Sequence, residues 1–242
     1  MKKIEFSLII PCYNEEKNIP LIIDRLKSRL NKKDFELILV DNGSKDHTQK
    51  AIKSFMNKHP SLKLVSVKKN IGYGWGIYSG LKKARGEFIG WTHADLQANP
   101  LDAFKALDIL KKQDSERKVF VKGRRYGRKL FDKLFTWGMN IIETLVLRRI
   151  LYDINAQPNV FRYDFMNLIN EPPKEFSFDL YMYYIAKKKG YKIIRFPVYF
   201  GKRIHGKSSW NTGIMSKYKL IKRTLDFTWD LKKRIKQEKQ IN

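Results

Sequence analysis

The feature that most constrains this chain is an apolar run that stops abruptly at a carboxylate. Residues 88–91 are apolar throughout, which is typical of a buried β-strand, and Asp95 follows shortly after them. Open α/β sheets bind their ligands beyond the carboxyl ends of such strands. Gln97 adds a second side-chain oxygen, and paired oxygen ligands suit a hard divalent cation. The stretch predicts either a cation site that holds a diphosphate or a plain turn in which Asp95 is a solvated cap.

The N-terminal half alternates expected strands with expected helices. Apolar runs predict strands at 4–11, 35–40, 62–67 and 88–91. Helical spacing of apolar residues lies between them, beginning with Ile19, Ile22 and Leu26. This alternation predicts a parallel, doubly wound α/β sheet. Because parallel strands end at one edge, we expect Asp41 and Asp95 to converge there.

The C-terminal half is less regular. We expect a helix from residue 100, a short strand at 119–123, a helix at 179–189, a strand at 192–200 and a basic amphipathic helix from 213. The stretch 130–151 is apolar and helical, with basic residues on both sides. Its pattern favours a core helix, and the alternative is a helix that lies in a membrane interface.

Composition limits the class of protein. The formal net charge of +26 predicts attraction to nucleic acid, anionic lipid or phosphorylated substrates, unless the lysines only solvate the surface. No helix-turn-helix, zinc-finger or RNP signature supports nucleic acid binding. The one cysteine, Cys12, excludes an internal disulfide framework. No apolar run reaches the roughly 18 residues that a membrane-spanning helix needs.

Two glycine patterns mimic nucleotide-binding motifs. Residues 201–208 satisfy the P-loop pattern, but their spacers are bulky and charged, and fewer than 40 residues follow them. The segment therefore predicts a phosphate-binding loop outside the P-loop class. Gly72, Gly74 and Gly76 lack the spacing of a dinucleotide-binding fold.

Six short motifs together resemble the family 2 glycosyltransferases of the GT-A fold, nearest to the dolichol- or polyprenyl-phosphate sugar synthases. In chain order they are residues 9–16, 40–46, 70–72, 93–97, 123–126 and 203–208. The resemblance runs from Ile4 to about Trp210. It implies an α/β GT-A domain over 1–212, with a mostly parallel doubly wound sheet and helices on both faces. Residues 213–242 would form a basic amphipathic C-terminal helix or tail.

The resemblance also implies the roles of site residues. Asp95 and Gln97 would hold Mg²⁺ or Mn²⁺ on the donor diphosphate. Asp95, Arg125, Arg203 and Asp153 would be the catalytic group. The phosphate-binding set would be Arg125, Arg203, Lys207 and Ser208. The nucleotide-binding set would be Pro11, Tyr13, Asn14, Glu15, Asp41, Asn42, Asn70, Gly72, His93 and Ala94.

The chain departs from the family pattern at two of these positions. Relatives commonly have Asp where this chain has Asn42 and His93. The imidazole of His93 would contact a metal or a ribose, or would simply be packed after the strand.

The need for a general base depends on the acceptor. A phosphate acceptor is already an anion and needs no strong base, whereas a hydroxyl acceptor needs one. Asp153 and Asp179 are the candidates. Each also has a structural interpretation, Asp153 beside Arg148 or Arg149 and Asp179 at the start of a helix.

The expected function is that of an inverting, metal-assisted glycosyltransferase. It would move a sugar from a nucleotide-sugar to a polyprenyl-phosphate or a lipid-linked glycan, in cell-envelope polysaccharide biosynthesis. The alternatives are transfer to a hydroxyl of a surface polysaccharide, a basic nucleic-acid-binding protein and an inactive GT-A scaffold. The basic segments predict a cytoplasmic protein held peripherally on the anionic inner face of the cytoplasmic membrane.

Overall fold

The computed structural model describes residues 3–113, 116–128, 130–206 and 221–233. The chain forms two compact units, one of residues 1–127 with 155–206 and one of residues 128–154 with 207–242. The predicted boundary at residue 212 stays a prediction, because residues 207–220 lie outside the described ranges.

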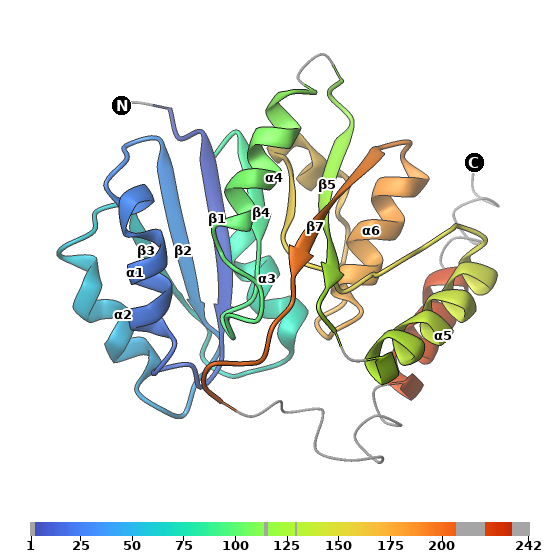
Figure 1. The fold of residues 1–242 in the computed structure, drawn as a ribbon, viewed down its shortest axis with the longest axis horizontal. Helices are drawn as coiled ribbons and strands as arrows, with labels where there is room; N and C mark the ends of the chain where they lie inside the picture. The colour runs from blue at the N-terminus through green and yellow to red at the C-terminus, as the bar shows by residue number, and fades with distance from the viewer. Residues whose placement is uncertain (1–2, 114–115, 129, 207–220, 234–242) are drawn as a thin grey trace. The chain divides into compact units, whose positions relative to one another are not determined.

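A seven-stranded sheet forms the centre of the first unit, in the order β3-β2-β1-β4-β6-β5-β7 (Figure 1). Only β6 runs antiparallel to its neighbours, so the predicted mostly parallel α/β sheet is confirmed. β6 itself was not predicted, because only two of its four residues are apolar and they do not extend into a longer apolar run. The strands are β1 (Phe6–Cys12), β2 (Phe35–Asp41), β3 (Leu62–Ser66), β4 (Phe88–Trp91), β5 (Val119–Tyr126), β6 (Asn159–Arg162) and β7 (Lys192–Tyr199).

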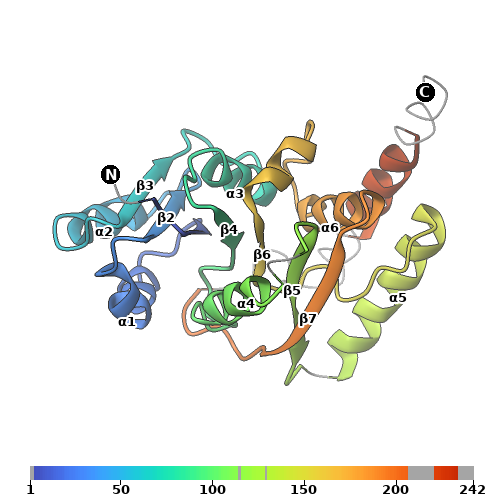
Figure 2. The ribbon, with the colours of Figure 1, turned by 90° about the horizontal axis from the view of Figure 1, so that it is seen from above.

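Helices cover both faces of this sheet. They are α1 (Ile19–Leu30), α2 (Thr48–Met56), α3 (Tyr73–Leu81), α4 (Asp102–Lys111) and α6 (Phe178–Lys188), with a 3-10 helix, η1 (Tyr163–Leu168), after β6. Figure 2 shows α1 and α4 on one face and α3 and α6 on the other. The alternation of β1 explains this: Leu8 and Ile10 belong to the core cluster that includes α1 and α4. Ile9 faces α3, where a Cβ on Gly80 would lie 2.5 Å from it.

An aromatic cluster fixes β4 in the middle of the sheet. The Trp91 ring is fully buried and meets Phe120, Phe161 and Phe178 edge-on, with centroid distances of 6.4, 5.8 and 5.6 Å. Each aromatic ring of this kind buries roughly 150–250 Å². The cluster joins β4, β5, β6 and α6 just before the chain enters the segment that contains Asp95.

The second unit contains α5 (Leu130–Leu147) and a helix over 221–233. α5 ends where Arg148 takes a positive φ of 51°. The hydroxyl of Thr144 accepts the backbone N–H of Leu151 at 3.0 Å, which turns the chain back. Within the described ranges, no helix combines the length and the apolar character that crossing a membrane requires.

One face of α5 is apolar and exposed. Trp137, Ile141 and Leu145 recur every four residues and are 61%, 38% and 71% exposed, while Asn140 and Glu143 are buried. Burial raises the pKa of Glu143 to about 8. The favoured prediction of a core helix is therefore wrong for this face, because the apolar stripe points outward. The interface alternative stays a prediction.

Candidate active site

The parallel strands bring the predicted site residues to one edge of the sheet. β1, β2 and β4 run in the same direction, so the segments after Cys12, Asp41 and Trp91 emerge together. Burial raises the pKa of Glu15, and the charge of Asp95 raises it further. Glu15 after β1 and Asp95 after β4 are therefore close enough for their charges to interact. The predicted convergence of Asp41 with Asp95 stays a prediction.

The segments after β1 and β2 are locked to each other. Asn14 has a positive φ of 56°, and its backbone N–H donates to Ser44 Oγ at 3.1 Å. The N–H of Glu15 donates to Thr48 Oγ1 at 2.8 Å, and Ser44 N–H donates to Asp41 Oδ1 at 3.0 Å. The structure thus brings Asn14, Glu15 and Asp41 together.

Asn42 has a structural task that Asp could not perform. Its Nδ2 donates to the Gly72 carbonyl at 3.0 Å and approaches Asn70 Oδ1 at 3.5 Å. The same Asn70 oxygen accepts the Gly72 N–H at 2.9 Å. A carboxylate at residue 42 would face two acceptor oxygens without a proton to offer. Asn42, where relatives commonly have Asp, therefore connects the end of β2 to the start of α3.

Gly72 is required at the start of α3. It has a φ of 134°, and a Cβ there would lie 2.2 Å from the carbonyl oxygen of Lys174. The backbone N–H of Trp75 donates to that same carbonyl at 2.9 Å. A side chain at position 72 would therefore separate α3 from residues 173–175.

Other predicted nucleotide-binding residues lie on the same edge. Pro11 is in β1 opposite Val40, and Tyr13 follows that strand with 37% of its surface exposed. Ala94 is buried beside Asp95. Of this group, Tyr13 is the side chain most open to a ligand.

Asp95 joins the segment after β4 to the segment after β7. Its Oδ1 accepts the Gln97 N–H at 3.1 Å, and its Oδ2 lies 3.0 Å from a guanidinium nitrogen of Arg203. The Gln97 side-chain amide donates to the Gly201 carbonyl at 2.9 Å. The Gly201 N–H donates back to the Gln97 carbonyl at 2.8 Å. Three of the predicted catalytic or metal-binding residues, Asp95, Gln97 and Arg203, therefore meet directly.

The donor atoms here suit a hard cation with few protein ligands. No cluster of three or more His, Cys, Asp or Glu residues suited to a metal exists among the described residues. Asp95 Oδ2 and the Gln97 side-chain carbonyl oxygen could supply two oxygens, and a bound diphosphate could supply others. Mg²⁺ is commonly held by one or two protein groups together with substrate phosphates. The two residues fit that arrangement.

His93 is packed into an aromatic stack. Its ring lies 5.4 Å from the Tyr73 ring at 24°, and Tyr73 lies 5.0 Å from Phe176 at 7°. Burial lowers the pKa of His93, the carboxylates of Asp95 and Asp179 oppose this, and the nearby guanidinium groups of Arg125 and Arg203 lower it further. A stacked imidazole with a lowered pKa agrees with the packed alternative for His93. No pattern in the sequence points to Tyr73 or Phe176 in this role.

A buried polar network supports the stack from behind. Asp179 Oδ1 accepts Gln157 Nε2 at 2.8 Å, Trp91 Nε1 at 3.2 Å and Asn159 Nδ2 at 3.4 Å. Lys122, fully buried, donates to Asn159 Oδ1 at 2.8 Å. Burial raises the pKa of Asp179, and the charge of Lys122 is the largest opposing influence. These contacts favour a structural role for Asp179 over that of a general base. In the sequence, only Lys122, a charged residue within the apolar run of β5, indicates this network.

Four predicted site residues remain, and the structure describes two of them, Arg125 and Asp153. Arg125 lies over the Phe200 ring, 5.3 Å from its centroid. Asp153, in the second unit, is buried, has a φ of 45° and lies 3.9 Å from Arg128. The expected neighbour was Arg148 or Arg149, whereas the ion pair found for Asp153 among the described residues is with Arg128. The catalytic role of Asp153 stays a prediction, and Lys207 and Ser208 lie outside the described residues.

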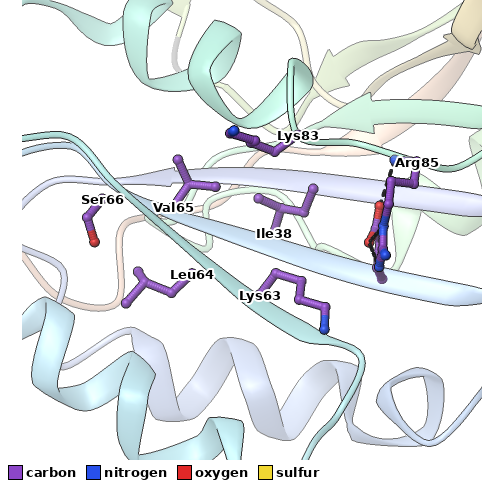
Figure 3. Close-up of a pocket in the computed structure, with 8 residues that line it drawn as sticks. Ile38, Lys63, Leu64, Val65, Ser66, Lys83 and Arg85 are labelled. Atoms are coloured by element: carbon purple, nitrogen blue, oxygen red, sulfur yellow. Dashed lines mark hydrogen bonds and ion pairs between the residues drawn. The ribbon is translucent and has the colours of Figure 1, made fainter.

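A separate pocket of about 460 Å³ lies against the edge strand β3 (Figure 3). Ile38 and Val65 contribute apolar side chains to it, and Arg85 pairs with Glu36 at 3.0 Å. None of the motif residues lines this pocket. It is a basic surface pocket distinct from the edge where Asp95 lies.

We expect Asp179→Ala to lower the free energy of unfolding by about 3–5 kcal/mol, because it removes the carboxylate that offsets a buried lysine. Urea denaturation measures this change. The matched control is Asp24→Ala, since Asp24 is an exposed carboxylate that pairs with Lys27 at 3.0 Å. That control should cost less than about 1 kcal/mol. Equal losses in the two variants would contradict the structural role of Asp179.

The sequence and the fold both have relatives among characterised proteins. A dolichyl-phosphate beta-glucosyltransferase ALG5A of Trichomonas vaginalis is 29% identical over 211 residues, covering 81% of this chain and 65% of that protein. A dodecaprenyl-phosphate galacturonate synthase of Rhizobium johnstonii is 25% identical over 165 residues, covering 67% of this chain and 49% of that protein. The chain thus spans less than two thirds of the length of either relative.

The fold matches solved glycosyltransferase structures. Glucosyl-3-phosphoglycerate synthase of Mycobacterium tuberculosis, in complex with Mn²⁺, UDP and phosphoglyceric acid, superposes with a TM-score of 0.69 at 17% identity, covering 94% of this chain and 78% of that one. This likeness confirms the predicted GT-A fold. The family described as "Glycosyl transferase family 2" matches residues 7–187. The chain belongs to glycosyl transferase family 2.

Proposed function

We propose that this chain is an inverting, metal-assisted glycosyltransferase that moves a sugar from a nucleotide-sugar to a polyprenyl-phosphate or a lipid-linked glycan. The observation that carries the proposal is the meeting of Asp95, Gln97 and Arg203 at the carboxyl edge of the sheet. The polyprenyl acceptor is supported by relatives that act on dolichyl and dodecaprenyl phosphates.

The donor would lie along the carboxyl edge of β1, β2 and β4. Asp41 and the locked segments around Asn14 and Glu15 would hold the nucleoside, with Asp41 accepting a hydrogen bond from the base. Asp95 and Gln97 would hold Mg²⁺ or Mn²⁺ against the diphosphate. The cation would neutralise charge on the departing nucleoside diphosphate. A related complex contains both UDP and Mn²⁺, in agreement with this assignment.

The two arginines would bind phosphate oxygens. Arg203 pairs with Asp95 at 3.0 Å beyond the carboxyl end of β4, and the charge of Arg125 also acts on the pKa of His93. A guanidinium presents a planar pair of donors that matches phosphate geometry and keeps its charge at any physiological pH. Charge developing on the leaving diphosphate would therefore meet fixed positive partners, which is usually the largest contribution to catalysis.

The chemistry of the acceptor is supported by the state of Asp179. A phosphate acceptor is an anion at neutral pH and attacks without a strong base. Asp179 uses one oxygen to accept three donors and is 2% exposed, so it is poorly placed to take a proton from a hydroxyl. With Asp179 disfavoured, Asp153 is the one of the two candidate bases that remains, and a phosphate nucleophile, which needs no base, is favoured over a sugar hydroxyl.

We expect Asp95→Asn to reduce sugar transfer by about 100-fold or more, because it removes the charge that holds the cation while preserving side-chain size. The assay offers radiolabelled UDP-, GDP- and CDP-sugars, each with Mn²⁺, to a short polyprenyl phosphate in detergent. The matched control, Asp24→Asn, alters an exposed carboxylate on α1 and should retain wild-type activity.

Other outcomes would redirect the proposal. Transfer to a polysaccharide but not to a prenyl phosphate would contradict the proposed acceptor. Wild-type transfer that persists at full rate in Asp95→Asn would contradict the proposed donor site. A lack of transfer from every donor, with salt-sensitive nucleic acid binding, would overturn the enzyme assignment.

The membrane would be contacted through the second unit. The exposed stripe of Trp137, Ile141 and Leu145 is followed by the exposed Arg148 and Arg149. Amphipathic helices of this kind bury their apolar face at the level of the headgroups, and each basic residue near an anionic surface contributes about 1 kcal/mol. The enzyme would thus be peripheral on the inner face of the cytoplasmic membrane, where a lipid-linked acceptor is within reach.

We expect Trp137→Ser combined with Leu145→Ser to weaken binding to anionic vesicles by at least about tenfold, because each apolar side chain removed from water is worth about 1.5–3 kcal/mol. Sedimentation with phosphatidylcholine–phosphatidylglycerol vesicles measures this. The control is Tyr163→Ser, which alters a side chain of the first unit that is 41% exposed. Unchanged sedimentation of the double variant would contradict the proposed membrane face.

A further inference from the structure

We propose that Arg203 and the divalent cation exchange places on Asp95, so that the enzyme binds the cation tightly only together with a diphosphate. This inference rests on the proposed function and concerns how the same site is controlled. Arg203 would hold Asp95 before the donor arrives and would move onto the diphosphate when the donor binds.

The two uses of Asp95 compete for one oxygen. Oδ1 accepts the Gln97 N–H at 3.1 Å, whereas among the described residues no backbone N–H is found on Oδ2, so Oδ2 is the better placed oxygen for a cation. That oxygen lies 3.0 Å from Arg203 Nη2. The Asp95 side chain is 8% exposed and that of Arg203 is 27% exposed, so water screens the pair only in part. A partly buried pair of this kind interacts more strongly than an exposed one.

A divalent cation and the Arg203 guanidinium repel each other when both contact the Asp95 carboxylate and no diphosphate is bound. A hard divalent cation sits about 2.0–2.6 Å from an oxygen ligand. Placed on Oδ2, it would face the positive guanidinium at short range, and Arg203 would have to withdraw. A diphosphate changes this balance, because its oxygens can bind both positive groups at once. Arg203 should therefore weaken cation binding when no diphosphate is present. It should strengthen cation binding when a diphosphate is bound.

The backbone around Arg203 allows the side chain to leave while its base stays fixed. Gly201 is held to Gln97 by two hydrogen bonds, one from each partner, at 2.8 and 2.9 Å. The Gln97 side chain donates through its nitrogen, which leaves its carbonyl oxygen available as a ligand. Beyond this anchor, Ile204, His205 and Gly206 are exposed, and Gly206 has a φ of 82°. Arg203 thus lies between the hydrogen-bonded Gly201 and the exposed residues 204–206.

The sign of this coupling distinguishes it from a purely structural ion pair. A structural pair would lose stability on removal of Arg203 and leave cation affinity unchanged or weaker. An exchange predicts that the same removal strengthens the binding of free cation. Coupling between two ligands of one protein typically changes affinity by about 5- to 150-fold.

The test is a titration of Mn²⁺ followed by electron paramagnetic resonance, which detects free Mn²⁺ and does not depend on turnover. We expect Arg203→Ala to bind Mn²⁺ alone at least about fivefold more tightly than wild type. Arg203→Gln, which keeps a long polar side chain, should behave in the same way. With UDP, GDP or CDP added, the order should reverse, and wild type should retain Mn²⁺ more tightly than either variant.

The matched control is Lys202→Ala, which removes one positive charge from the neighbouring exposed residue. It should change Mn²⁺ affinity by less than twofold. Equal Mn²⁺ affinity in wild type and both Arg203 variants would overturn the exchange and leave the proposed function intact. An equal gain in Lys202→Ala would also overturn it, because general charge would then explain the effect. No Mn²⁺ binding by any form with any nucleotide would overturn both the exchange and the metal-assisted function.

Discussion

The position of Asp95 depends on how tightly β4 is held at its carboxyl end. Trp91 is buried among three aromatic rings, and its indole N–H donates to Asp179 at 3.2 Å. Because the strand cannot shift along the sheet without breaking these contacts, the segment that follows begins at a fixed point. Asp95 then fastens that segment to the one after β7 through Arg203. One buried ring therefore determines where the most important carboxylate of the site stands.

Much of the fold could be predicted because it depends on local patterns. Continuous apolar runs identified β1, β2 and β4, and helical spacing identified α1. Their shared direction also predicted that Asp41 and Asp95 would meet at one edge. The antiparallel β6 could not be predicted in this way, since its four residues acquire their pairing only from β4 and β5.

Residues of the site that follow directly after strands could be predicted. Residues that support the site through long-range contacts could not. Asp95, Gln97 and Arg203 carry recognisable motifs, and the structure brings them together. Tyr73, Gln157 and Lys122 support the site through contacts between residues distant in the sequence, which no local pattern reveals. The favoured prediction for α5 was a core helix, whereas its apolar stripe is exposed. Periodicity identifies an apolar face but does not show whether protein covers it.

The central claim is that the edge of the sheet around Asp95 binds the donor diphosphate with a divalent cation. A crystal grown with Mn²⁺ and a nucleoside diphosphate tests it directly, since anomalous scattering locates manganese without reference to any assumed ligand. We expect an anomalous peak within coordination distance of Asp95 and Gln97, with Arg203 turned toward the diphosphate. A nucleotide bound elsewhere, such as in the pocket beside β3, with no peak at Asp95, would contradict it.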